Sequence, residues 1–223
     1  MTKLKMILIA TAVVLAVGVA AIYILPRPAL AQGQSSTPLM ALSCDCQEAS
    51  FGDLAADAVR AAGGADIAFV GAISFRPGTL TPGALTKERV ATLLANPDEV
   101  WAVSRLTGAQ VRAALEHSVR TAPLPNNAFL QVAGLSFDYS SAAPQLQRVR
   151  AVQVGMGALS DAGTYNVAMP LSLAKGGSGY FKIFTKDAIT RQGETSLADA
   201  IVSYAAQQGS VVYTGMGRIN VVP

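Results

Sequence analysis

The pattern of apolar positions divides this chain into a leader and a longer region of alternating helix and strand signals. Residues 6–25 form a 20-residue run without a charged side chain, and Lys3 and Lys5 precede it. A run of this length at helical rise can cross the hydrocarbon core of a bilayer. Two prolines and a small-x-small sequence at residues 29–31 follow it. A basic start, an apolar core and a small-residue exit are typical of a secretory signal peptide.

We therefore expect residues 1–31 to be a signal peptide that is cleaved after Ala31. Because the apolar run is longer than in most cleaved signals, the alternative is an uncleaved N-terminal membrane anchor formed by residues 6–25. In both cases Lys3 and Lys5 stay on the cytoplasmic side. The rest of the chain is then exported to a periplasmic or extracellular location, either secreted or held at the membrane.

After the leader, residues 32–47 show no periodicity and are interpreted as a short linker, whereas residues 48–223 are interpreted as one domain. Helices are predicted after Phe51-Gly52, from Thr86, from Thr107 to about Arg120, and from Ser196 to about Gly209. Strands are predicted at residues 67–70, 99–106, 128–139, 147–156, 164–170 and 211–222. This interleaving predicts an α+β fold with a mixed or antiparallel sheet and packed helices, preceded by one N-terminal apolar helix.

Composition and charge change the picture in one respect. A chain of 223 residues that is 51% hydrophobic suits one core and a short appendage. The net charge of +3 comes from Lys3, Lys5 and Arg27, which lie before residue 32 where no acidic residue occurs. The exported part is therefore neutral, which removes the usual electrostatic argument for nucleic-acid binding.

The two cysteines, Cys44 and Cys46, form a C-x-C sequence just before the domain. Export permits a disulfide, but a bridge that spans one residue is strained and easily reduced. Metal binding through Cys44, Asp45 and Cys46 lacks further ligands at a helpful spacing. We interpret the pair as a strained local disulfide or two free thiols, with pairing to another chain as the alternative.

Candidate catalytic residues are few in this sequence. His117 is the only histidine and lies on the helix predicted from Thr107, so we interpret it as a surface or half-buried helix residue. One histidine cannot supply the ligands of a dinuclear metal centre. The GGSG sequence at 176–179 lacks the Lys-Ser/Thr of a phosphate-binding loop and is interpreted as a tight turn. We predict no catalytic residue, no metal site and no cofactor.

Two stretches carry a family resemblance, namely FGDLAADAVRAAGGADIAFVGAISFRPGTL at 51–80 and YNVAMPLSLAKGGSGYF at 165–181. In order and spacing they resemble the C-terminal, substrate-binding domain of the 5'-nucleotidase family. In that family a separate N-terminal metallophosphoesterase domain carries two metals and a catalytic His/Asp pair. The resemblance implies a recognition domain without its catalytic partner.

The resemblance also implies roles for individual residues. Gly52-Asp53-Leu54 and Asp57-Ala58 match a G-D-L-x-x-D-A helix of the family. Arg76 stands where the family has a substrate-binding arginine, whose bidentate fork suits a carboxylate or phosphate. The glycines that precede this arginine in the family are replaced here by residues 72–74, so side chains stand where a ligand would approach backbone.

The family's aromatic residues are missing at the matching positions. Its P-F-x-N segment, with a stacking Phe, corresponds to residues 95–99, which contain no aromatic residue. Its F-x-x-x-G-G-D-G-Y motif corresponds to residues 172–180, where Ser172 replaces the second ring and Ser178 the ribose-binding Asp. The resemblance implies Arg76, Gly176, Gly177 and Ser178 as ligand-binding residues. Base stacking contributes about 1–3 kcal/mol per base, so nucleosides should bind weakly or not at all.

Two functions are compatible with these observations. The first is an exported, non-catalytic accessory or interaction module, with a membrane protein complex as its partner. The second is a nucleotide-binding component of nucleotide hydrolysis, in which Arg76 helps to bind substrate and a separate catalytic chain supplies the metals. A stand-alone hydrolase is a distant third, although the resemblance alone would class the chain with hydrolases of nucleotide catabolism.

Overall fold

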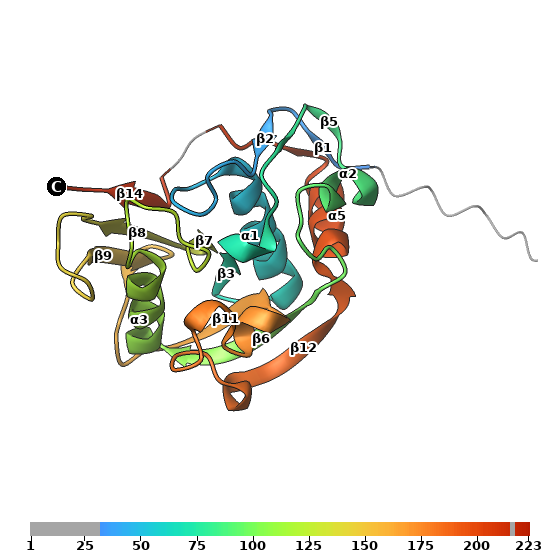
Figure 1. Ribbon diagram of the computed structural model, residues 1–223. Helices are drawn as coiled ribbons and strands as arrows, with labels where there is room; N and C mark the ends of the chain where they lie inside the picture. The colour runs from blue at the N-terminus through green and yellow to red at the C-terminus, as the bar shows by residue number, and fades with distance from the viewer. Residues whose placement is uncertain (1–31, 215–216) are drawn as a thin grey trace, which may run out of the picture.

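A mixed five-stranded sheet forms the centre of the computed structural model, which describes residues 32–214 and 217–223 (Figure 1). The strand order is β12-β6-β11-β3-β7. β11 is parallel to β3, and the other neighbouring pairs are antiparallel. The bounds are β3 (Ile67–Gly71), β6 (Val100–Thr107), β7 (Leu130–Ala133), β11 (Thr164–Pro170) and β12 (Ile189–Ser196). The α+β fold with a mixed sheet is therefore confirmed.

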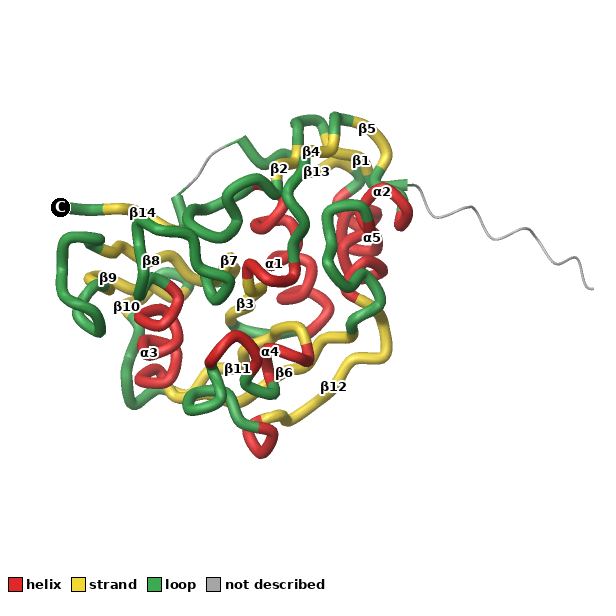
Figure 2. Tube along the Cα trace, viewed as in Figure 1, coloured by secondary structure: helices red, strands yellow, loops and turns green. Residues whose placement is uncertain are grey.

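Helices cover both faces of this sheet (Figure 2). On one face lie α1 (Ser50–Gly63), α2 (Lys87–Ala91) and α5 (Leu197–Gln208), and on the other lies α3 (Gly108–Ser118). β3 is buried on both sides, because Ala68 and Val70 face the first core while Ile67 and Phe69 face the second. This explains why the strand is a continuous apolar run rather than an alternating one.

Side chains cap three of the four predicted helix starts. Thr107 and Gln110 form a complete capping box on α3, as predicted. Ser196 accepts a hydrogen bond from Asp199 N, and Thr86 accepts one from Arg89 N. α2 is shorter than its pattern indicated, although Val90, Leu93 and Leu94 are all buried as expected.

A second sheet of four strands lies beside the first, in the order β10-β9-β8-β14. Its strands are β8 (Leu135–Tyr139), β9 (Val149–Val154), β10 (Gly157–Ala158) and β14 (Ile219–Val221). The single strand predicted at 128–139 is wrong, because Gly134 has a φ of 76° and separates β7 from β8. A side chain at Gly134 would bring its Cβ to 2.1 Å from the carbonyl oxygen of Asp66. Each half therefore joins a different sheet.

Short strands attach the remaining segments to the domain. β1 (Gln34–Ser35) pairs with β13 (Ser210–Val211) and β5 (Gly83–Ala84), and β2 (Leu39–Met40) pairs with β4 (Thr79–Leu80). Residues 32–47, predicted as a linker, are thus part of the fold, since their strand partners lie too far along the chain to leave a local pattern. The strand predicted at 211–222 is likewise wrong, because its ends join different sheets as β13 and β14.

A buried polar network ties the C-terminal strand to α1. Arg218 pairs with Asp57 through two hydrogen bonds, at 3.0 and 2.8 Å, and lies 3.7 Å from Asp53. One carboxylate oxygen of Glu48 accepts backbone N–H groups from residues 217–219. Both aspartates belong to the G-D-L-x-x-D-A sequence of α1, so this part of the motif has a structural role here.

The predicted leader, residues 1–31, lies outside the described residues. Among the described residues no helix is long and apolar enough to span a bilayer.

Candidate ligand-binding pocket

A pocket of about 540 Å³ lies at the carboxyl ends of the two parallel strands of the central sheet. Ile73 follows β3 and Leu171 follows β11, while Asn96 lies in the segment that leads into β6. All three residues line the pocket, so parts of the three family-like segments, 71–76, 95–99 and 171–180, meet around one cavity. The carboxyl ends of parallel strands are a common place for ligands in α/β proteins.

Main-chain hydrogen bonds hold the first wall of the pocket, the loop at 71–76. Its short 3₁₀ turn, η1 (Ala72–Ser74), is tied to the neighbouring chain by Ala72 N donating to Phe129 O at 2.8 Å. Ala95 N donates to Ser74 O at 2.9 Å and so joins this loop to the second wall. Ile73 is 55% exposed and, with Ser74, lines the pocket where the family has glycine. Side chains therefore occupy space next to the backbone, as predicted.

The third wall is the short helix α4 (Leu171–Ala174). Glu99 accepts a hydrogen bond from Ser172 N at 2.8 Å and holds the start of this helix against β6. Gly177 lies close beneath it, since a Cβ there would come within 2.8 Å of Ser172 O. Lys175 completes the wall, and the described residues that line the pocket include no aromatic side chain.

The predicted ligand-binding residues lie around this pocket rather than in its lining. Arg76 is exposed, and its Nη2 donates to the carbonyl oxygen of Ala95, a lining residue, at 3.4 Å. Arg76 is therefore at the rim.

Gly176 and Ser178 have φ values of 90° and 54° and, with Gly177, form the tight turn after α4 that the sequence predicted. Glu99 and Lys175, the charged residues of the lining, lie within the family-like segments 95–99 and 172–180, but neither stands at a position for which the resemblance implies a role.

His117 contributes to the packing of this turn. It lies half-buried on α3, with its ring centroid 4.3 Å from that of Tyr180. Its Nε2 is 3.0 Å from the carbonyl oxygen of Ser178. Burial lowers the pKa of His117 below its ordinary value. The interpretation of His117 as a half-buried helix residue is confirmed.

The C-x-C segment lies next to the pocket, and both cysteines are free thiols in the structure. A smaller cavity of about 280 Å³ is lined by Cys44 and also by Ile73, which it shares with the main pocket. Burial raises the pKa of Cys44 to about 12, which disfavours the reactive thiolate. The buried side chain of Gln131 donates to the carbonyl oxygens of Cys44 and Gln47 and fixes this segment on β7. A disulfide between Cys44 and Cys46 stays a prediction.

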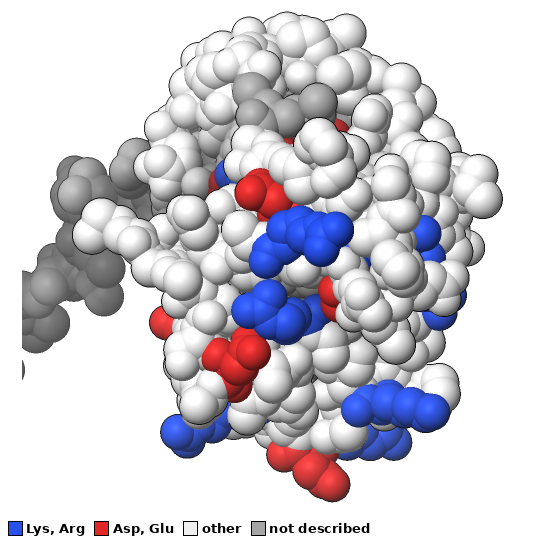
Figure 3. Space-filling view, turned by 90° about the vertical axis from the view of Figure 1, so that its left-hand side faces the viewer, with Lys and Arg blue, Asp and Glu red and all other residues white. Residues whose placement is uncertain are grey.

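Two further features of the described part of the molecule concern its metal ligands and the charge of one face. Within residues 32–214 and 217–223, no group of three His, Cys, Asp or Glu side chains is arranged to hold a metal ion. On the face drawn in Figure 3, basic side chains lie beside acidic ones, and much of the surface carries neither.

Comparison with known proteins identifies the fold. A structure of a 5'-nucleotidase precursor from Thermus thermophilus matches with a TM-score of 0.75 and 25% identity, over 86% of this chain and 39% of that one. A NAD nucleotidase from Haemophilus influenzae matches with a TM-score of 0.70 and 16% identity, over 87% and 39% of the two chains. A sulfate thiohydrolase from Thermus thermophilus matches with a TM-score of 0.65 and 21% identity, over 85% and 34%. This chain thus spans about two fifths or less of each of these proteins.

One of two sequence comparisons supports the same family. No curated protein sequence matches this chain. A family model described as "5'-nucleotidase, C-terminal domain" matches residues 31–186, which is more than half of the chain. The matched residues include all three walls of the pocket. Because the match extends over most of the sequence, the chain belongs to the 5'-nucleotidase C-terminal domain family.

Proposed function

We propose that this chain is an exported, non-catalytic recognition module that acts as an accessory subunit, either secreted or anchored at the membrane by residues 6–25. The observation that carries the proposal is the state of the pocket. The three family-like segments form its walls, but by the resemblance Ile73 and Ser74 stand in place of glycines and Ser172 in place of a ring. A scaffold that has kept its shape while its ligand contacts changed fits a role in protein contacts better than a role in nucleoside binding.

Export is part of the proposal and has two supports. The leader has the charge and apolar pattern of a signal sequence. One structurally similar protein is a 5'-nucleotidase precursor. The proposed partner is a membrane protein complex or a separate catalytic chain.

The proposal predicts that the pocket does not take up nucleosides. Calorimetric titration of the full-length chain with adenosine and with AMP, up to millimolar ligand, should give no saturable heat. A matched titration of a 5'-nucleotidase that contains both domains shows that the assay detects binding. Saturable binding to this chain would contradict the proposal.

The second candidate function is a nucleotide-binding component that works with a separate catalytic chain. Arg76 favours it, because its guanidinium is exposed at the rim of the pocket and can reach an anionic group. This candidate predicts binding of AMP that Arg76→Gln weakens and that adenosine, which has no phosphate, does not share. The titration described above therefore separates the two functions.

Co-purification tests the accessory role itself. The full-length chain should co-purify with a membrane complex after mild solubilisation of its native membranes. Recovery of the chain as a detergent-free monomer without a partner would count against this role.

A further inference from the structure

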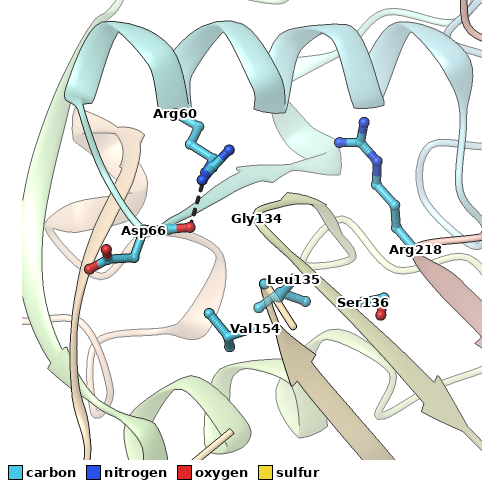
Figure 4. Close-up of a pocket in the computed structure, with 8 residues that line it drawn as sticks. Arg60, Asp66, Gly134, Leu135, Ser136, Val154 and Arg218 are labelled. Carbon is cyan, nitrogen blue, oxygen red and sulfur yellow. Dashed lines mark hydrogen bonds between the residues drawn. The ribbon is translucent and has the colours of Figure 1, made fainter. Parts of the chain in front are cut away.

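A second cavity, of about 430 Å³, lies at the opposite end of the central sheet from the pocket just described (Figure 4). The first pocket follows the carboxyl ends of β3 and β11, whereas this one lies where α1 ends and β3 is about to begin. Its walls come from α1, from the start of β8, from the end of β9 and from the start of β14. It shares no lining residue with the first pocket, so an inference about it is independent of the function proposed above.

Arg60 is the group in this cavity that is best placed to bind a ligand. Its Nε donates to the carbonyl oxygen of Asp66 at 3.0 Å, which fixes the plane of the guanidinium. The Asp66 carboxylate does not neutralise it, because Oδ2 accepts from Asn166 N at 2.9 Å and the carboxylate points away from Arg60 (Figure 4). Among the described residues, no carboxylate lies within ion-pair distance of Arg60, and its two terminal nitrogens make no hydrogen bond.

Gly134 shows that the position of Arg60 is built into the backbone. A Cβ at Gly134 would lie 2.7 Å from Nε of Arg60 and 2.1 Å from the carbonyl oxygen of Asp66. Gly134 also has a φ of 76°, a conformation that side chains disfavour. Gly134 therefore leaves free the space that the Arg60 guanidinium and the carbonyl oxygen of Asp66 occupy.

The other walls define what can lie against Arg60. Arg218 stands across the cavity, but its Nη1 donates to Asp57 and to the carbonyl oxygen of Val132, and its Nη2 donates to Asp57. Direct recognition thus falls to Arg60. Leu135 and Val154 supply an apolar surface beside it. Pockets for small molecules usually have volumes of about 300–1,000 Å³, so this one suits a small ligand.

We propose that this cavity binds a small organic oxyanion. The carboxylate or phosphate of the ligand accepts one hydrogen bond from each of the two terminal nitrogens of Arg60, and the short apolar body of the ligand lies on Leu135 and Val154. The fork of an arginine matches the two oxygens of such a group, whereas a lysine offers only a point charge.

The test is calorimetric titration of the full-length chain at constant ionic strength with sodium butanoate and, separately, with inorganic phosphate. We expect saturable binding of at least one of the two anions. Arg60→Gln should weaken that binding about tenfold or more, because a charge-assisted hydrogen-bond pair is lost. Arg60→Lys should weaken it less, since the charge stays but the fork is lost. Butan-1-ol, which has the apolar body without the charge, should not bind.

Arg120→Gln is the matched control, because Arg120 is an exposed arginine in the turn that follows α3 and does not line this cavity. Its binding should equal that of the unmodified chain. Thermal unfolding of each variant shows whether the fold is intact. The proposal is overturned if neither anion gives saturation, or if Arg60→Gln and Arg60→Lys bind both anions as tightly as the unmodified chain.

Discussion

At the level of single residues, the pocket at the ends of β3 and β11 differs from its family through a few side chains. Ile73, Ser74 and Ser172 line the pocket, and the resemblance implies glycines at the first two positions and an aromatic ring at the third. Arg76, at the rim, is unchanged in type. Two main-chain hydrogen bonds hold the backbone of the loop at 71–76, in which Phe129 O accepts from Ala72 N and Ala95 N donates to Ser74 O.

We predict that restoring the lost residues increases nucleoside binding. The double variant Ile73→Gly, Ser172→Phe should bind adenosine more tightly than the unmodified chain, because a stacked base contributes about 1–3 kcal/mol. Calorimetric titration measures the change. Gln145→Phe, which places a ring elsewhere on the surface, is the control and should bind no better. Equal affinity in the double variant and the control would show that rings alone do not account for the loss.

Buried acids beside the C-terminal strand form a second feature at this scale. One oxygen of Glu48 and one of Asp53 are buried without a hydrogen bond in the described part of the chain. Burial raises the pKa of Asp53 to about 8, against the opposing charge of Arg218, and the neighbouring Glu48 adds to the rise. A proton held between the two carboxyl groups satisfies both oxygens.

This proton makes stability depend on pH. The folded state binds an additional proton between pH 3.8, the ordinary pKa of Asp, and about 8. The contribution of Asp53 is therefore fully present below pH 3.8 and is lost as the pH rises toward 8. Asp53→Asn can donate an N–H to Glu48 without a titrating proton, so the decrease in unfolding free energy between pH 5 and 8 should become smaller.

Urea unfolding of the full-length chain at several pH values measures this slope. Asp187→Asn, at an exposed carboxylate, is the control and should leave the slope unchanged. An identical slope in Asp53→Asn and the unmodified chain would mean that Asp53 is ionised in the folded state.

At the level of elements, local chemistry predicted those whose signals lie within a few residues. The capping box at Thr107, the cap at Ser196 and the apolar run of β3 were all found where the sequence placed them. β12 was not predicted, because its sequence, ITRQGETS, is largely polar and exposed. It exists because β6 offers it an edge to pair with. Pairing with a distant strand leaves no periodicity in the strand itself.

The capping box predicts a specific cost of mutation. Thr107→Ala removes the acceptor for Gln110 N and should lower the free energy of unfolding by about 1 kcal/mol. Thr185→Ala is the matched control, since Thr185 precedes a 3₁₀ turn without a side-chain cap and should change stability little. Urea unfolding of both variants provides the comparison. An equal decrease in the free energy of unfolding of both variants would show that the capping hydrogen bond of Thr107 adds nothing to stability.

At the level of the whole molecule, the described residues form a 5'-nucleotidase C-terminal domain, in which the two cavities discussed above lie at opposite ends of the central sheet. It spans about two fifths or less of the nucleotidases and the thiohydrolase whose folds it shares. Residues 1–31 decide whether the domain is released or stays anchored at a membrane, and their sequence is the basis for the prediction that follows.

We predict that the mature chain begins at Gln32. Intact-mass measurement of the chain from soluble and membrane fractions of its native host tests this directly. Ala31→Arg should block cleavage, because the site requires a small residue, and should leave the chain in the membrane fraction. Retention of Met1 in the unmodified chain would contradict cleavage and support an anchor.

The sequence by itself determined the family, the mixed α+β class and the capped helices. These depend on residue identity and on patterns within about ten residues. The tertiary structure decided which segments meet, because hydrogen bonds and packing join residues far apart along the chain. It moved residues 32–47 into the domain, placed Arg76 at the rim and Gly176, Gly177 and Ser178 in a turn. It also brought Arg60 and Leu135 to one cavity, which no local pattern could indicate.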